Sequence, residues 1–224
     1  MKKFALLALF FAICNADVNN GENGVFSNGV GIRANFNEPL KIEPKFQTKQ
    51  VFKSDEYSNQ NIADSLRSAS AKSNIDKRVL YTIAKIESGF KPLTISFTSY
   101  SKDFSYPNLK RKVGKYKDKY IISFSGKEND LKPAVFDLIS KGYNVDCGLM
   151  QINSANFKKS EIDKIFKLDY NIAKSVKVLS SCINLKGKMS DSIEYYNKGT
   201  RRFYTSYDYY KNFKYYYLKS FARI

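Results

Sequence analysis

The sequence contains no histidine among its 224 residues. Imidazole is the base of Ser-His-Asp and Cys-His hydrolases and the usual ligand or base of zinc enzymes. Its absence therefore excludes these hydrolases and most zinc enzymes. General acid or base chemistry must then fall to a carboxylate, a lysine or a tyrosine. The Asp and Glu residues show no metal-ligand spacing, so we expect neither a metal nor another cofactor.

The sequence also lacks an apolar run long enough to cross a membrane, and its mean hydropathy is −0.45. At the N-terminus Lys2 and Lys3 precede the apolar run 4–13, which is far shorter than the roughly 20 residues of a membrane-spanning helix. This pattern predicts a signal peptide over 1–16 and a soluble periplasmic protein. Cys14 leaves a lipoprotein as the alternative, although the residues before it fit a lipobox poorly.

Cysteine is scarce, with three residues in the chain. Removal of Cys14 with the signal peptide leaves Cys147 and Cys182, and an even pair in an exported protein favours a disulfide. That bond would close a loop of 35 residues and contribute about 3–4 kcal/mol of stability. The alternative is two buried thiols. Neither cysteine is expected to be catalytic, because no histidine is present to activate a thiolate.

Acidic residues are few relative to basic ones, 21 against 38, which gives a net charge of +17. Nucleic acid is one partner that such a charge attracts. For an exported protein, however, anionic polymers of the cell envelope are the expected partner and nucleic acid is not. Plain solubility of a lysine-rich chain is the third interpretation.

The first part of the chain shows little periodicity. Residues 17–58 are rich in Gly, Asn and Lys and are predicted to form a flexible leader. Helical spacing begins with a helix over 61–72. Asp76 is a good N-cap for a second helix, which Gly89 ends.

The middle of the chain changes character. Residues 94–98 and 120–125 alternate apolar and polar side chains, as half-buried strands do. The basic segment 109–119 lies between them. These patterns predict a two-stranded β-ribbon with a charged, exposed connection.

Helical spacing returns after the ribbon. The fold class expected is therefore mainly α (α+β), with one domain over 59–200 and a Tyr-rich C-terminal segment, 201–224, packed on it as a helix. Stacking of those rings on sugars is the alternative for the tail. The further helices are predicted over 131–141, 160–166 and 171–184, from 190, and in the tail from 202.

Glu87 stands at the end of an apolar helical stripe. Leu80, Ile83, Ala84 and Glu87 are spaced i, i+3, i+4 and i+7, so they share one helix face. A carboxyl group in that position loses water, which raises its pKa toward the range that a general acid needs. The alternative is a structural glutamate at the rim of the core.

Three segments in order carry a family resemblance. Glu87-Ser88, the hexapeptide GLMQIN at 148–153 and Tyr195-Tyr196-Asn197 resemble the signatures of the soluble lytic transglycosylases of the lysozyme superfamily. The resemblance spans about 59–199, roughly three-fifths of the chain. It implies a lysozyme-like fold and lytic cleavage of peptidoglycan. The short chain is most similar to the small transglycosylases attached to type IV secretion machineries, whose components are possible partners.

The resemblance also implies a role for each matching residue. Glu87 would protonate the glycosidic oxygen between N-acetylmuramic acid and N-acetylglucosamine. It would then take the proton of the muramoyl C6 hydroxyl, giving a 1,6-anhydro product. The implied substrate-binding residues are Ser88 at the carboxyl or sugar, Met150 and Gln151 along the groove with Leu149 behind them, Asn153 in the loop, Tyr196 with its hydroxyl near Glu87, and Asn197 beside it.

Two departures from the family pattern leave alternatives open. Tyr195 stands where the family commonly has alanine, and the segment between Glu87 and Gly148 is long. Ordinary glycosidases use two carboxylates, and Asp146 is the best candidate for a second one, although a loop-capping role suits it as well. A hydrolytic muramidase and a non-catalytic peptidoglycan-binding scaffold are therefore the competing functions.

Overall fold

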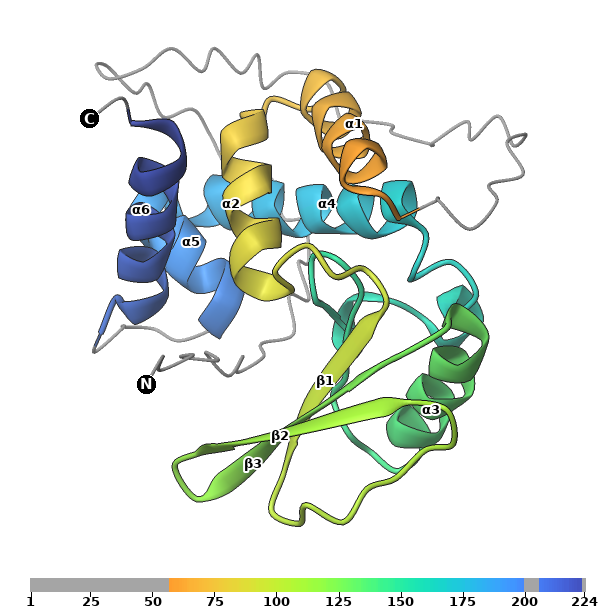
Figure 1. Ribbon diagram of the computed structural model, residues 1–224. Helices are drawn as coiled ribbons and strands as arrows, with labels where there is room; N and C mark the ends of the chain where they lie inside the picture. The colour runs from red at the N-terminus through yellow and green to blue at the C-terminus, as the bar shows by residue number, and fades with distance from the viewer. Residues whose placement is uncertain (1–56, 200–205, 223–224) are drawn as a thin grey trace.

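The chain folds into a helical part and a sheet part, as the computed structural model shows for residues 57–199 and 206–222. Five helices form the helical part, and α3 lies beside the sheet below it (Figure 1). No helix in these two ranges is long and apolar enough to cross a bilayer. The helices are α1 Asn59–Ala71, α2 Lys77–Glu87, α3 Glu128–Ser140, α4 Leu168–Lys186, α5 Met189–Lys198 and α6 Asp208–Phe221.

The mainly α (α+β) fold is confirmed, and local signals account for the two helices that lead to Glu87. Ser58 caps α1 by accepting a hydrogen bond from the backbone N–H of Asn61. Asp76 caps α2 as predicted, accepting from the N–H of Arg78 at 2.7 Å. Beyond its end, Gly89 has a φ of +60°. A residue without Cβ adopts that conformation at little cost, so the helix stops there.

The predicted two-stranded ribbon is wrong in number, because the sheet has five strands in the order β2-β3-β1-β4-β5. The segments expected to pair do so, as β1 and β3. The basic segment between them is also a strand, β2. It lies at the edge of the sheet, where both faces can carry lysines, so it lacks the apolar alternation by which a strand is predicted. The strands are β1 Thr94–Ser99, β2 Lys110–Tyr116, β3 Lys119–Ser125, β4 Asp146–Cys147 and β5 Ile152–Asn153.

The predicted helix over 160–166 is also wrong. The structure has 3₁₀ turns there, η1 Ser154–Asn156 and η2 Lys159–Glu161, followed by further turns. Ile162, Ile165 and Phe166 are buried, which explains their helical spacing. The carbonyl of Ile165 accepts a hydrogen bond from the side-chain amide of Asn171 at 2.9 Å, in place of the backbone hydrogen bond that a helix would make. The other central helices, α3, α4 and α5, are confirmed.

The expected disulfide between Cys147 and Cys182 is absent: both cysteines are buried, and no bond joins them. The backbone explains the distance. Asn171 of α4 donates to the carbonyl of Cys147 at 2.9 Å, whereas Cys182 lies 11 residues further along the same helix. Cys182 therefore lies about 16 Å along the helix axis from Asn171, the residue that contacts Cys147, whereas the Cα atoms of a disulfide lie roughly 6 Å apart.

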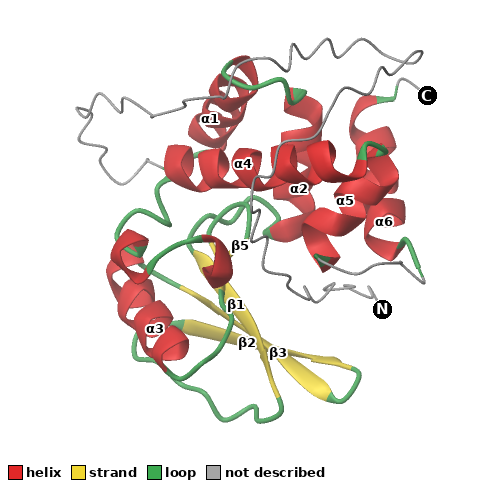
Figure 2. Cartoon of the chain, turned by 180° about the vertical axis from the view of Figure 1, so that it is seen from behind, coloured by secondary structure: helices red, strands yellow, loops and turns green. Residues whose placement is uncertain are grey.

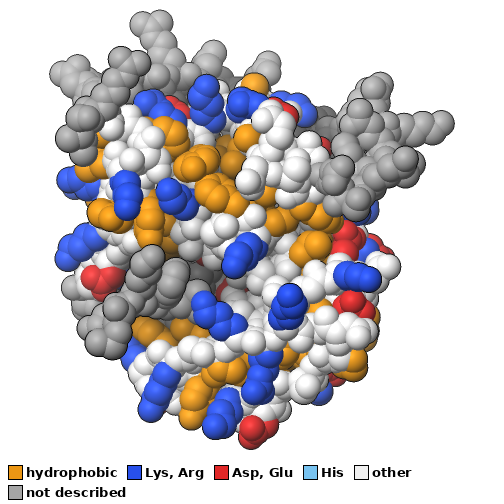
Figure 3. Space-filling model, in the orientation of Figure 1, with side chains coloured by type: hydrophobic (Ala, Val, Ile, Leu, Met, Phe, Trp, Pro, Cys, Tyr) orange, Lys and Arg blue, Asp and Glu red, His pale blue; other side chains and the backbone are white. Residues whose placement is uncertain are grey.

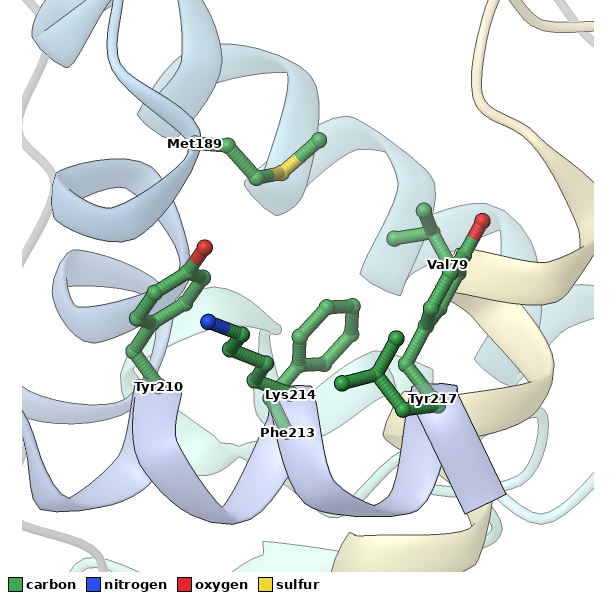
Figure 4. A pocket seen from close by; sticks show the side chains of 7 residues that line it. Val79, Met189, Tyr210, Phe213, Lys214 and Tyr217 are labelled. Atoms are coloured by element: carbon green, nitrogen blue, oxygen red, sulfur yellow. The ribbon is translucent and has the colours of Figure 1, made fainter. Parts of the chain in front are cut away.

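The C-terminal helix α6 packs against α2 and α5. Tyr209 and Phe213 are its buried residues. An apolar cavity of about 190 Å³ remains along α6, and Figure 4 shows the side chains around it. No carboxylate lines this cavity. Its lining residues are Val79 of α2, Met189 of α5, and Tyr210, Phe213, Lys214, Tyr217 and Leu218 of α6.

Three of the sequence predictions stay predictions. The signal peptide over 1–16, with Cys14, lies outside the described residues, as does the leader over 17–58 apart from its last two residues. The domain limits 59–200 and 201–224 likewise rest on the sequence alone.

The buried thiols give a first testable prediction. Alkylation of the denatured protein without reductant should modify both Cys147 and Cys182, because the structure leaves both reduced. Peptide mass spectrometry after proteolysis measures this directly. A cross-linked peptide that contains both residues, two hydrogen masses lighter than the sum of its halves, would contradict the structure.

Candidate active site

Glu87 is the last residue of α2, whose C-terminal end points toward the sheet (Figure 1). Leu80, Ile83 and Ala84 on the same face are completely buried, as the spacing predicted. The Glu87 side chain keeps partial exposure. The helix therefore inserts an apolar stripe into the core and leaves a carboxyl group at the boundary between core and solvent.

The pKa of Glu87 is raised to about 8, because burial disfavours the charged form of its carboxyl group. The hydroxyl of Tyr209 donates a hydrogen bond to Oε1 of Glu87, which lowers that pKa in part. A carboxyl group with this pKa is largely protonated at neutral pH and still able to ionise. Such a group can donate a proton and later accept one.

Tyr209 was missed by the sequence reasoning. It lies in α6, 122 residues from Glu87 in the chain, among many tyrosines. No local signal distinguishes it from its neighbours, since its role depends on how α6 docks. Its ring is completely buried, and its own pKa is raised by that burial and by the Glu87 charge.

The start of α6 is held by a buried carboxylate on α5. Glu194 has no exposed surface and accepts hydrogen bonds from the backbone N–H groups of Tyr209 at 3.2 Å and Tyr210 at 2.9 Å. Lys198 forms an ion pair with it at 2.7 Å. Negative charge at the first turn stabilises a helix through its unsatisfied N–H groups. Glu194 thereby fixes the position from which Tyr209 reaches Glu87.

The GLMQIN loop, 148–153, is anchored by Asn171 of α4. The side chain of Asn171 accepts from the N–H of Met150 at 2.8 Å and donates to the carbonyl of Cys147. Gly148 has a φ of +82°, and a Cβ there would lie 2.4 Å from Nδ2 of Asn171. Only glycine fits this close approach. The sequence reasoning assigned the tight turn to Gly148 but did not find Asn171.

Gln151 and Asn153 tie the loop to the sheet. Gln151 accepts from the Ser96 hydroxyl at 2.7 Å and donates to the carbonyl of Gly148 at 2.8 Å. Asn153 donates to Oδ1 of Asp146 at 3.0 Å and caps η1. Strand β5 lies at the junction of the helices and the sheet, as seen from behind in Figure 2. These bonds hold the loop next to the end of α2.

The remaining predicted residues are placed as follows. Leu149 and Met150 are completely buried, so Met150, expected along the groove, belongs to the core. Ser88 caps the end of α2, where its hydroxyl donates to the carbonyl of Ala84 at 3.3 Å. Asn197 is buried, and its Nδ2 has no hydrogen-bond partner among residues 57–199 and 206–222.

Tyr196 lies close enough to Glu87 to feel its charge but makes its hydrogen bonds to other residues. Its hydroxyl shares a 2.8 Å hydrogen bond with Ser175 and donates to the carbonyl of Met150 at 3.3 Å. Burial and the charge of Glu87 both raise the pKa of Tyr196. The tyrosine that bonds to Glu87 is therefore Tyr209, and Tyr196 joins the signature loop to α4.

Asp146, the candidate second carboxylate, is buried in β4. Burial raises its pKa well above the usual range, and the neighbouring charge of Glu87 raises it further. The charge of Glu87 therefore acts on Asp146, and burial favours the neutral form of both carboxyl groups. Within the described ranges no three His, Cys, Asp or Glu side chains gather as metal ligands.

The face seen in Figure 3 is hollowed between the helical part and the sheet part. Lys and Arg side chains stand around this hollow, while acidic side chains are few on the same face. The surroundings of the site are therefore positively charged, which favours an anionic ligand.

Comparison with known proteins gives one match. The family model "Transglycosylase SLT domain" matches residues 64–218, a stretch that includes Glu87, the signature loop and most of α6. The search of curated proteins and the search of solved structures each gave no match.

The loop geometry gives a second prediction. Gly148→Ala should lower the free energy of unfolding by about 3 kcal/mol. The added Cβ would overlap the side chain of Asn171, and alanine would have to adopt the left-handed backbone conformation of Gly148. Gly142→Ala is the matched control: its φ is +83°, but no atom lies within 4 Å of the added Cβ, so about 1 kcal/mol is expected. Denaturant unfolding measures both. Equal losses would show that the contact with Asn171 carries no cost.

Proposed function

The chain belongs to the transglycosylase SLT domain family and so acts on peptidoglycan as a lytic transglycosylase; from that premise, we propose that Glu87 is its single general acid and base. The bond cleaved is the β-1,4 bond from N-acetylmuramic acid to N-acetylglucosamine. The product is a 1,6-anhydro-muramoyl end. The observation that carries this proposal is the desolvated Glu87 carboxyl, bonded to Tyr209.

In the first step Glu87 acts as an acid. Its raised pKa keeps the proton on the carboxyl group at neutral pH. That proton passes to the glycosidic oxygen as the bond from this oxygen to C1 of the muramoyl residue breaks. N-acetylglucosamine leaves with its 4-hydroxyl restored, and Glu87 becomes a carboxylate.

In the second step Glu87 acts as a base. The muramoyl C6 oxygen bonds to C1, and its proton returns to Glu87, so the enzyme regains its starting state. The carboxylate that exists between the two steps is stabilised by the hydrogen bond from Tyr209. Tyr209 therefore favours the ionised form that burial alone would oppose.

The environment of Asp146 favours this route over hydrolysis by two carboxylates. A hydrolase of that type needs one acid and one ionised partner. Asp146 is buried and accepts a hydrogen bond from Asn153, and burial raises its pKa, which favours the neutral form of its carboxyl group. This supports a structural role for Asp146 in the loop, and the C6 hydroxyl then takes the place of water.

The residues of the signature segments are proposed to orient the substrate and the catalytic group. Gln151, held between Ser96 and the loop backbone, borders the groove. Ser88 fixes the end of α2 and so the direction of Glu87. Tyr196 of α5 holds the loop through the carbonyl of Met150, and Asn153 holds it through Asp146 of β4.

The cellular setting is a further part of the proposal. The predicted signal peptide supports export to the periplasm, where the substrate lies. The similarity to small transglycosylases of secretion machines supports a role in opening the cell wall for a secretion or conjugation apparatus.

The third prediction tests the catalytic assignment. Glu87→Gln should reduce release of 1,6-anhydro-muropeptides from purified sacculi roughly a thousandfold, since general acid–base catalysis is removed, while binding to sacculi persists. Asp146→Asn is the matched control and should retain activity within about tenfold. Mass spectrometry of the digest measures both. Products without the anhydro mass would identify a muramidase, and clearing by Glu87→Gln would overturn the site.

The fourth prediction concerns pH. Activity requires protonated Glu87, so kcat/KM should fall as pH rises through about 8. Tyr209→Phe removes a hydrogen bond that lowers the pKa of Glu87, so this fall should move to higher pH, while kcat drops about tenfold. Tyr207→Phe is the control, since that hydroxyl bonds to Asp191. A pH profile unchanged in Tyr209→Phe would contradict the assigned contact.

A further inference from the structure

One face of the sheet is turned away from the apolar core. Along β1 the buried residues are Ile95, Phe97 and Ser99, and the rings of Phe104 and Tyr143 pack on Phe97. Successive strand residues point to opposite faces. Thr94, Ser96 and Thr98 therefore share the other face. Thr98 pairs with the buried Ile121 of β3, whereas Ser96 and Thr94 pair with Ser123 and Ser125, so hydroxyl groups line these two rows.

The pairing register extends this face across four strands. Ser96 pairs with Asp146 of β4 on one side and with Ser123 of β3 on the other, and Ser123 pairs with Lys112 of β2. The next row runs from Thr94 through Ser125 to Lys110. Strands lie about 4.8 Å apart, so the Cα atoms of Asp146 and Lys112 are separated by about 14 Å.

The same face leads to the candidate active site. The hydroxyl of Ser96 donates to Gln151 of the signature loop. Asp146, at the end of the row, lies near enough to Glu87 for the two charges to interact. A chain bound along the row would therefore have one end at Glu87 and its neighbouring groups over β3 and β2.

The far end of the face is strongly basic. Residues 110–119 contain six Lys or Arg and one Asp. Arg111 belongs to the opposite face, where it donates to the carbonyls of Lys102 and Phe104 at 3.0 Å. Lys110 and Lys112 belong to the hydroxyl face, and both are exposed. The rows of Ser and Thr hydroxyls can form hydrogen bonds with a glycan, and the two lysines favour a ligand that also carries negative charge.

We propose that this face, with Lys110 and Lys112, binds the carboxylates of the peptide stems of peptidoglycan beside the cleavage site. The inference rests on the proposed function, since the glycan itself must lie at Glu87. In stem-bearing peptidoglycan the lactyl group of the muramoyl residue is an amide, so the carboxylates lie on the stem, away from the sugar. Lys112 lies about 14 Å from Asp146. It is therefore better placed to contact the carboxylates of a stem than the sugar whose bond breaks.

The test compares native sacculi with sacculi whose carboxylates have been amidated by carbodiimide and a neutral amine. Binding is measured by co-sedimentation in the Glu87→Gln background, so it does not depend on turnover. Lys110→Gln/Lys112→Gln should bind native sacculi about fivefold more weakly than the parent. On amidated sacculi the two proteins should bind equally, and the parent should lose affinity to the same level.

Lys72→Gln/Lys77→Gln is the matched control, because it removes the same charge at the C-cap of α1 and at the first residue of α2, the end of that helix opposite Glu87. It should bind native sacculi like the parent. An equal loss in the control would assign the effect to net charge, and unchanged binding by the Lys110/Lys112 variant would assign these lysines to protection of the sheet edge; either result overturns the proposal. Anhydro-product analysis of the catalytically competent protein is a separate readout, so failure of the proposed function is distinguishable.

Discussion

The hydrogen bond between Tyr209 and Glu87 is the interaction on which the site depends. It joins the end of α2 to the first turn of α6, two helices that lie far apart in the sequence and pack against each other. Without it a carboxyl group bordered by buried Leu80, Ile83 and Ala84 would have little to stabilise its ionised form. With it the group can change charge during the reaction. Glu194 and Lys198 give the contact its geometry, because Glu194 accepts a hydrogen bond from the backbone N–H of Tyr209 and Lys198 forms an ion pair with Glu194.

The sequence was sufficient where structure follows from neighbouring residues. Asp76 and Gly89 predicted both ends of α2, and the apolar spacing predicted which face Glu87 shares. It was insufficient where a side chain acts across the chain. Asn171 and Glu194 look like ordinary polar residues of amphipathic helices, and their function appears only when the loop and α6 are placed against them. The same limit explains the wrong disulfide prediction. An even number of cysteines favours a pair, but it does not reveal that Cys182 lies three helical turns from Asn171, the residue that contacts Cys147.

The strands show a related limit. Alternation of apolar and polar residues identified β1 and most of β3, where Ile122 and Phe124 share the buried face, but the edge strand β2 has no such pattern. The two-residue strands β4 and β5 are too short to carry any period. They exist because the signature loop crosses back on itself between Asp146 and Asn153, whose side chains bond to each other. A motif recognised for its chemistry thus also completes the sheet, and this joins the sheet face to the active site.

The position of Asp146 favours the proposed reaction with one carboxyl group. Two carboxyl groups that interact cannot both ionise cheaply in a desolvated site, and the one with less access to water keeps its proton. Asp146 is the buried member, and Asn153 donates to it, so its place is set by the loop and not by a substrate. The raised pKa of Asp146 favours its neutral form, which adds little repulsion to an ionised Glu87. In the proposed reaction Glu87 acts on the glycan, while Lys110 and Lys112 at the basic edge of the sheet hold an anionic stem.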